Sequence, residues 1–152
     1  MRVGLISDTH GLLRPEAIEL LRGASHIIHA GDIGGADILS GLRALAPLTA
    51  VRGNNDHAPW ARGVRATETV RLGEVRIHVV HDLAELAIDP AAEDVRVVVS
   101  GHSHRPRIEE RAGVLYVNPG SAGPRRFRLP VALARLEIAG TDVQAAIEEL
   151  AL

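Results

Sequence analysis

Polar side chains that can bind metal ions follow five apolar segments of this 152-residue sequence. Each apolar segment has the length of a short buried strand. The residues that come next are Asp8-Thr9-His10, Gly31-Asp32, Gly53-Asn54-Asn55-Asp56, His81-Asp82 and Gly101-His102-Ser103-His104. Carboxylate oxygen, amide oxygen and imidazole nitrogen suit Mn²⁺, Fe²⁺, Zn²⁺, Ni²⁺ or Mg²⁺. Because open α/β sheets bind ligands at the carboxyl ends of their strands, we expect these side chains to form one site.

The spacing of these residues supports a shared site. Asp8 and His10 are two positions apart, as are His102 and His104, so both members of each pair point the same way if the chain is extended. Three glycines directly precede candidate ligands and permit a close approach of the backbone to a crowded centre: Gly31, Gly53 and Gly101. The sequence has no cysteine, which excludes disulfides and thiolate ligands.

The first half of the chain alternates between predicted strands and helices. The apolar segments Val3–Ser7, His26–Ala30 and Leu48–Arg52 are typical of buried strands. Helices are predicted from Pro15 to the stop at Gly23, and from about Ala36 to Leu45. This order implies a parallel sheet with right-handed crossovers.

The second half is typical of hairpins. Gly73-Glu74, a pair suited to a type II′ turn, separates strands at Thr69–Leu72 and Val75–Val80, and Ala112-Gly113 separates strands at Ile108–Arg111 and Val114–Val117. Further strands are predicted at Val95–Ser100 and Val131–Ile138. Residues 143–150 fit a helix or a strand, and the turn-like residues 139–142 favour the strand. We therefore predict one α/β domain over residues 1–152, with two mixed β-sheets packed face to face and flanking helices.

Composition limits the classes of partner and location. The apolar share is 46%, which suffices for an ordinary core in a chain of this length. The net charge is −2 and the arginines are scattered, so no stable nucleic-acid partner is expected. The N-terminal apolar run reaches Asp8 too early for a signal peptide or membrane span, which favours a cytoplasmic protein without a membrane partner. A homodimer is plausible for so short a chain.

The ordered motifs resemble the calcineurin-like metallophosphoesterase superfamily. Its pattern is D-x-H, then G-D, then G-N-[HCN]-[DE], then a histidine after a strand, then G-H-x-H, and the resemblance runs from residue 1 to about residue 128. The segment Asn118-Pro119-Gly120-Ser121 is similar to the small YfcE-like branch. The resemblance implies an α/β/β/α sandwich with a metal centre at one edge.

The resemblance also implies a role for each ligand. Asp8, His10 and His104 would hold one divalent ion, Asn54, His81 and His102 a second, and Asp32 would bridge them, with Mn²⁺ favoured. Two ions, two carboxylates and a bridging hydroxide leave a net charge of +1, which attracts a phosphate ester. The implied reaction is hydrolysis of a small phosphoester by the bridging hydroxide. A phosphodiester is favoured because that branch includes phosphodiesterases.

Two positions depart from the family pattern. Asn55 stands where many members carry a histidine that protonates the leaving oxygen, which predicts a steep dependence on the leaving group. Asp56, counted with Asp32, Asn54 and Asn55 among the candidate catalytic residues, is expected to orient the Asn54 loop. Asp82 follows His81 where H-G-H is common, and it could bind the free ring nitrogen of His81 or shape the substrate pocket.

Other functions and roles remain open at this point. A phosphomonoesterase or nucleotide hydrolase of the same family is one alternative, and a non-catalytic protein-binding scaffold like the retromer subunit is another, although all seven ligand positions are present. His57 is an exposed loop residue or a substitute acid, and Trp60 is a loop anchor or a pocket wall. The remaining histidines within predicted strands are expected to be structural, and the arginines after residue 124 are expected to be solvated: His26, His29, His78, Arg125, Arg126 and Arg128. The alternatives are that His29 supports a ligand and that the arginines steer phosphate.

Overall fold

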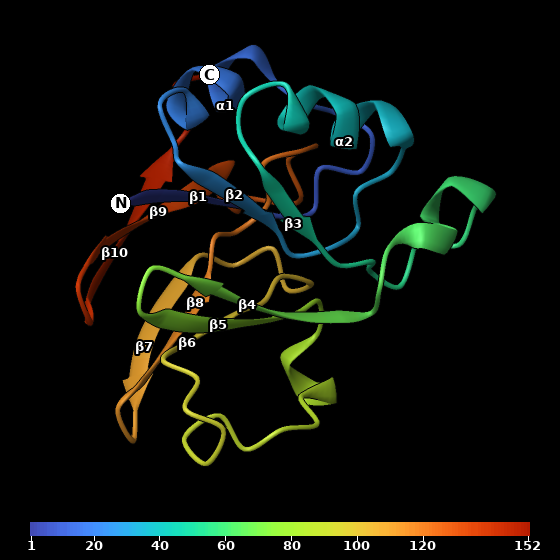
Figure 1. Cartoon of the computed structure of the whole chain (residues 1–152). Helices are drawn as coiled ribbons and strands as arrows, with labels where there is room; N and C mark the ends of the chain where they lie inside the picture. Colours follow the sequence, from blue (N-terminus) through green and yellow to red (C-terminus); the bar gives the residue numbers. More distant parts are fainter.

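Two five-stranded mixed sheets pack face to face in the computed structural model, which describes all 152 residues (Figure 1). The first sheet has the order β10-β9-β1-β2-β3 and the second the order β4-β5-β6-β8-β7. The first comprises β1 (Arg2–Ile6), β2 (His26–His29), β3 (Leu48–Ala50), β9 (Ala132–Ala139) and β10 (Asp142–Glu149). The second comprises β4 (Thr67–Leu72), β5 (Val75–Val80), β6 (Val97–Val99), β7 (Arg107–Arg111) and β8 (Val114–Asn118). The predicted fold class is confirmed.

Three adjacent strands of each sheet are parallel. In the first sheet β1 pairs with β2 and β2 with β3 in parallel. In the second sheet β5 pairs with β6 and β6 with β8 in parallel. In the first sheet β9 pairs antiparallel with β1 and with β10, and in the second sheet β4 pairs antiparallel with β5 and β7 with β8. Each sheet therefore directs the carboxyl ends of three strands to one edge, where polar loops follow.

Apolar side chains fill the space between the sheets. Leu5 and Ile28 of the first sheet and Ile77 and Val97 of the second belong to one buried cluster of 16 residues. A second cluster lies on the other face of the first sheet, where α1 (Pro15–Leu21) and α2 (Ala36–Arg43) cover it (Figure 1). The β1, β2 and β3 strands are thus buried on both faces, which explains their nearly continuous apolar sequences.

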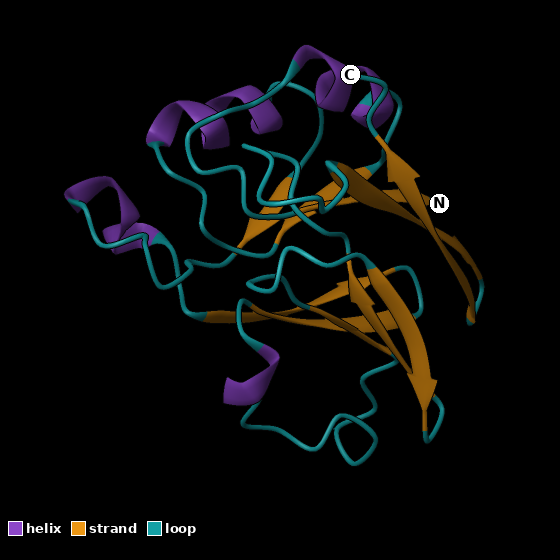
Figure 2. Ribbon diagram, turned by 180° about the vertical axis from the view of Figure 1, so that it is seen from behind, coloured by secondary structure: helices purple, strands orange, loops and turns teal.

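The outer face of the second sheet lacks an α-helix. The segment after β5 covers it instead, with the 3₁₀ turn η2 (Leu83–Glu85) near its start (Figure 2). Leu83, Leu86 and Ile88 of this segment pack on a small cluster that includes Val80 and Val98. No helix of the structure is both long enough and apolar enough to cross a membrane.

Most predicted elements are present, with shifted ends. Residues 142–149 form β10, as the strand interpretation required, because a two-residue turn with Gly140 at φ +62° joins it to β9. The predicted strand at Val95–Ser100 is reduced to Val97–Val99, and the one at Leu48–Arg52 ends at Ala50. The 3₁₀ helix η1 (Pro59–Gly63) was not predicted.

Candidate metal centre

The loops after β1, β2, β5 and β6 bring carboxylates and imidazoles together. Asp8, His10 and His104 form one group in which one ligand atom of each residue lies within 4.8 Å of the others, and Asp8, Asp32 and His81 form a second. Five of the seven predicted ligands therefore converge, although they come from strands as far apart in the chain as β1 and β6.

In the first group, Nε2 of His104 lies 3.3 Å from Oδ1 of Asp8. Nε2 of His10 lies 3.4 Å from Nε2 of His104 and 3.8 Å from the same Asp8 oxygen. Two ring nitrogens and one carboxylate oxygen thus face a common point. This is the donor set of a divalent-metal site.

The second group shares Asp8 with the first. Nε2 of His81 lies 3.3 Å from Oδ2 of Asp32 and 3.9 Å from Oδ1 of Asp8. Oδ2 of Asp32 also lies 3.8 Å from Nε2 of His10. Asp32 is therefore within reach of both groups, which is the position that a bridging carboxylate needs.

Asn54 and His102 lie beside the second group rather than in it. Nδ1 of His102 is 3.3 Å from Oδ1 of Asn54, and its ring centre is 5.2 Å from that of His81. The backbone N–H of His102 donates to Oδ2 of Asp8 at 3.1 Å. Both side chains are more exposed than the other ligands, so they form the solvent-facing side of the centre.

Buried ligand atoms without a hydrogen-bond partner fit a bound cation. Four buried side-chain atoms of the chain lack a partner, and three belong to this centre: Asp8 Oδ1, His81 Nε2 and His104 Nδ1. Such atoms are costly in a protein interior. Nδ1 of His81 donates to the carbonyl of Ala30 at 2.7 Å, which leaves Nε2 as the free nitrogen facing the carboxylates. A cation between Nε2 of His81 and Oδ1 of Asp8 would satisfy both of these atoms, whereas Nδ1 of His104 lies on the other side of its ring from Nε2, the atom that faces Asp8.

The charges of the Asp8 and Asp32 carboxylates also favour binding of a cation. Burial alone would raise the pKa of Asp8, but the His104 imidazole and the Ser7 hydroxyl hold that pKa below its usual value. Burial likewise opposes ionisation of Asp32, yet His81 and the backbone N–H of Asn55 lower its pKa. Burial would lower the pKa of His81, but the two carboxylates raise it. Both carboxylates are therefore charged and attract a cation into the space between them.

Asp56 connects two of the ligand loops. This buried carboxylate accepts hydrogen bonds from the backbone N–H groups of Ile33 (2.9 Å), Gly34 (3.1 Å) and Gly53 (2.9 Å). It therefore fixes the loop of Asp32 relative to the loop of Asn54. The structure places Asp56 as a positioning residue, as expected from its sequence, with its oxygens turned toward backbone.

Asn55 holds the central carboxylate. Its backbone N–H donates to Oδ1 of Asp32 at 3.0 Å, and its side-chain amide donates to Oδ2 at 3.1 Å. Position 55 thus supplies hydrogen bonds to Asp32 in place of an acidic proton.

Three further residues position the ligands but were not assigned a role from the sequence. Ser7 donates to Oδ2 of Asp8 at 2.6 Å, and Ser121 donates to the Asp8 carbonyl at 2.9 Å. The amide of Asn118 donates to the carbonyl of Gly101 and to the hydroxyl of Ser103, each at 3.0 Å. Asn118 and Ser121 belong to the segment Asn118–Ser121 that resembles the YfcE-like branch. The sequence therefore marked these two residues, but it did not predict their hydrogen bonds to the ligand loops.

Left-handed backbone conformations set the directions of the ligands. Asp8, His10, Asp32, His102 and His104 have φ values between +47° and +70°. The expectation that Asp8/His10 and His102/His104 share a direction because the chain is extended is therefore wrong. These pairs lie in turns beyond the strand ends, and residues other than glycine adopt this conformation at some cost. Such strain is typical of functional sites.

Glycines permit the close packing of these loops, as predicted. A Cβ atom on Gly31, at φ +104°, would lie 2.6 Å from Nδ1 of His81. A Cβ on Gly101 would overlap Ser7 and Asp8, and one on Gly53 would overlap Asp32. No side chain fits at these positions without displacing a ligand.

His29 is a satisfied structural residue that orders two ligand loops. Its Nδ1 accepts from the N–H of Gly31 at 3.0 Å, so its Nε2 carries the proton and donates to Oγ1 of Thr9 at 3.0 Å. Thr9 in turn donates to the carbonyl of Ile33 at 2.8 Å. Complete burial lowers the pKa of His29 to about 4, which keeps the ring neutral.

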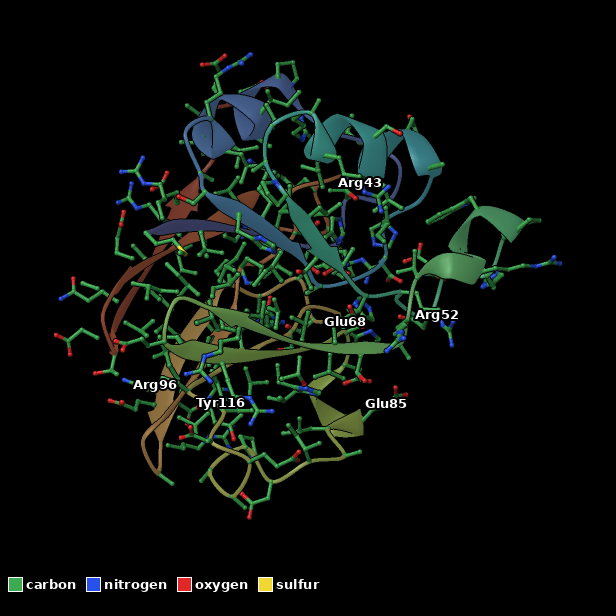
Figure 3. The ribbon with its side chains drawn as sticks, viewed as in Figure 1. Arg43, Arg52, Glu68, Glu85, Arg96 and Tyr116 are labelled. Atoms are coloured by element: carbon green, nitrogen blue, oxygen red, sulfur yellow. The ribbon has the colours of Figure 1, made fainter.

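The other open roles are also resolved by position. Asp82 caps η2 through Ala84 and lies 3.7 Å from Nε2 of His102, so it does not bind the ring nitrogen of His81. It lines a cavity beside the second group that Arg52 and Glu85 also border (Figure 3). Trp60 packs on the core beneath the helices and is a loop anchor. His57 is exposed.

The sequence matches a known family over most of its length. The sequence model of the calcineurin-like phosphoesterase superfamily domain matches residues 1–141. A probable metallophosphoesterase of Methanothermobacter thermautotrophicus is 34% identical over 161 residues, covering 97% of this chain and 91% of the relative. A phosphodiesterase of Methanocaldococcus jannaschii is 29% identical over 140 residues, covering 79% and 83%. The chain belongs to the calcineurin-like phosphoesterase superfamily, which confirms the resemblance seen in the motifs.

Solved structures share the fold. The phosphoesterase Yfce from E. coli is 25% identical, covers 90% of this chain and 88% of its own, and has a TM-score of 0.69. Vps29 from Chaetomium thermophilum is 22% identical, with 99% and 97% coverage and a TM-score of 0.79. The likeness to Vps29 is one of fold, because the identity is low.

Proposed function

We propose that this protein is a metal-dependent phosphoesterase that favours phosphodiesters and works with two divalent metal ions. The observation that carries the proposal is the convergence of Asp8 and Asp32 with the imidazoles of His10, His81 and His104, with buried ligand atoms left unpaired. Membership of the phosphoesterase superfamily and the similarity to an archaeal phosphodiesterase support it.

The ligands divide between the two ions as the motifs imply. Asp8, His10 and His104 would hold the first ion, Asn54, His81 and His102 the second, and Asp32 both, with Mn²⁺ favoured. When bound, the two ions lower the pKa of a water molecule so that it can attack phosphorus, and they stabilise negative charge on the phosphate.

The chain's own residues orient this chemistry. The neutral amide of Asn54 keeps the site more positive than a third carboxylate would, which favours an anionic substrate. Asn55 and Ser7 hold the carboxylates of Asp32 and Asp8 in place. Since Asn55 is no acid, the leaving oxygen departs without a proton from this position.

Hydrolysis of bis(p-nitrophenyl) phosphate tests the proposal. With Mn²⁺ the wild-type protein should release p-nitrophenol, and a chelator or the substitution Asp8→Ala should abolish the reaction. His57→Ala is the matched control, because this histidine is exposed on a loop and should leave the rate unchanged. Measured metal content should be two ions per chain. A rate that is absent, or that the chelator does not change, would contradict the proposal and favour the protein-binding scaffold.

The preference for diesters is tested with p-nitrophenyl phosphate, which has the same leaving group. We expect the diester to be hydrolysed with the higher kcat/KM. A higher value for the monoester would identify a phosphomonoesterase built on the same centre.

A further inference from the structure

The loop Pro124–Arg128 lies beside the first group of ligands. Together with His10 and His104, the residues Pro124, Arg125, Arg126 and Phe127 line a cavity of about 450 Å³. This volume is within the range of small-molecule sites. The loop therefore faces the space next to a phosphate held at the proposed metal centre.

The base of this loop is attached to the loop of Asp8. Ser121 donates to the carbonyl of Asp8, and the backbone N–H of Ala122 donates to the carbonyl of Ser7 at 3.1 Å. Nε of Arg14 donates to the carbonyl of Gly123 at 3.2 Å. The segment from which the loop starts is therefore held against the loop of Asp8.

Phe127 does not contribute to the hydrophobic core, so packing does not explain a phenylalanine at this position. It is the single phenylalanine of the chain, and 88% of its surface is exposed. Its φ is +54°, a conformation that is rare for a bulky side chain. The other residues with positive φ include five proposed metal ligands. An aromatic ring that is both strained and exposed at the rim of the centre is available for stacking on a ligand.

The neighbouring arginines are free to bind an anion. Neither Arg125 nor Arg126 has a carboxylate within 4.0 Å, and the cavity they line contains no acidic residue. Guanidinium groups bind phosphate oxygens with paired hydrogen bonds.

A second cavity, next to His102, is also lined by arginines and an aromatic ring, but there the ring and two of the arginines are paired within the protein. There Arg111 covers the ring of Tyr116, with its guanidinium carbon 4.4 Å from the ring centre. Tyr116 lies on the outer side of the second sheet (Figure 3). Arg107 and Arg111 lie 2.8 and 3.6 Å from carboxylate oxygens of Glu109. The Tyr116 ring and the guanidinium groups of Arg107 and Arg111 therefore already have partners within the protein.

We propose that the Pro124–Arg128 loop is a nucleotide subsite. In this proposal, which rests on the proposed function, an aromatic base stacks on Phe127 and the phosphate contacts Arg125 and Arg126. The substrate is then a small nucleotide phosphoester rather than an arbitrary one.

Paired binding measurements test the subsite. Isothermal titration of the Mn²⁺-loaded protein with thymidine 5′-phosphate and with 2-deoxyribose 5-phosphate compares ligands that differ in the base. We expect the nucleotide to bind about 10-fold more tightly, as one stacked base allows. Phe127→Ala should bring the ratio of the two Kd values to about one, and Phe127→Tyr should preserve it. Arg125→Ala and Arg126→Ala should weaken both ligands and leave the ratio unchanged.

Arg128→Ala is the matched control, since Arg128 is in the same loop but does not line the cavity. It should change neither Kd. Equal Kd values in the wild type, or a ratio that survives Phe127→Ala, would overturn the subsite. These results are independent of hydrolysis. A failed proposed function would instead show as loss of chelator-sensitive turnover of bis(p-nitrophenyl) phosphate, whatever the Kd ratio is.

Discussion

The side-chain amide of Asn55 lies 3.1 Å from Oδ2 of Asp32, the carboxylate oxygen that faces the imidazoles of His10 and His81. Its backbone N–H lies 3.0 Å from the other oxygen of the same carboxylate. Asn55 therefore orients Asp32 through both its backbone and its side-chain N–H groups. An amide does not release a proton at neutral pH, so a residue that holds Asp32 in this way provides no acid catalysis.

We expect the rate of hydrolysis to depend steeply on the leaving group. Without a general acid at position 55, esters of poorly acidic alcohols should lose about 10²–10⁴ in rate compared with an enzyme that protonates them. The measurement is kcat/KM for methyl phosphodiesters with aryl and alkyl leaving groups. Similar rates across this series would show that another residue supplies the proton.

Substitution of Asp56 should destabilise the fold. Asp56→Ala leaves the N–H groups of Ile33, Gly34 and Gly53 without their acceptor, at a cost of about 3 kcal/mol in the free energy of unfolding. Urea unfolding measures this change, and the exposed Asp37→Ala should alter it by no more than about 1 kcal/mol. A small effect at Asp56 would mean that the two ligand loops do not depend on this carboxylate.

Metal binding should stabilise the folded protein. An ion at 100 times its Kd adds about 2.7 kcal/mol, which for a chain of this size raises Tm by roughly 5–10 °C. Thermal unfolding with and without Mn²⁺ should show this rise in the wild type and in His57→Ala. Asp8→Ala and Asp32→Ala should abolish it, because each removes an oxygen that faces both imidazole groups. An equal rise in these variants would place the ions elsewhere.

The order of the elements and the convergence of five of the proposed ligands could be predicted from the sequence, because strands of the parallel type are apolar on both faces and end abruptly at polar residues. Gly73 shows the same agreement, since its φ of +60° fits the predicted type II′ turn. The directions of Asp8 and His104 could not be predicted. They depend on left-handed backbone stabilised by distant partners such as Ser121 and Asn118, and sequence spacing carries no record of such contacts.

The free energy of unfolding should decrease as pH falls, because His29 is buried in its neutral form. Its pKa is about 4 in the folded protein and near 6.5 when unfolded, so below pH 6.5 the unfolded chain binds a proton that the folded chain does not. Stability is therefore lost as pH falls from 6.5 toward 4. By pH 5 the loss should be about 2 kcal/mol. Urea unfolding in metal-free buffer at pH 7 and pH 5 measures it, and His29→Gln should lack this contribution.

Phe127→Gly should be more stable than Phe127→Ala by about 1 kcal/mol, because glycine adopts a φ of +54° without steric cost. Both variants remove the ring and should lose the preference for thymidine 5′-phosphate. Thermal unfolding of the two variants checks the difference. Equal stability would show that the loop relaxes and that Phe127 is not strained in solution.

The two sheets contribute different members of the proposed ligand set. All the oxygen donors follow strands of the first sheet, in Asp8, Asp32 and Asn54, and three of the four imidazoles follow strands of the second. An ion bound between them therefore acts as a cross-link between layers that are otherwise joined mainly by apolar contact. Neither half of the polypeptide can assemble the centre alone, so hydrogen exchange in the strands facing the interlayer core should slow throughout when metal binds, well beyond the loops that touch it.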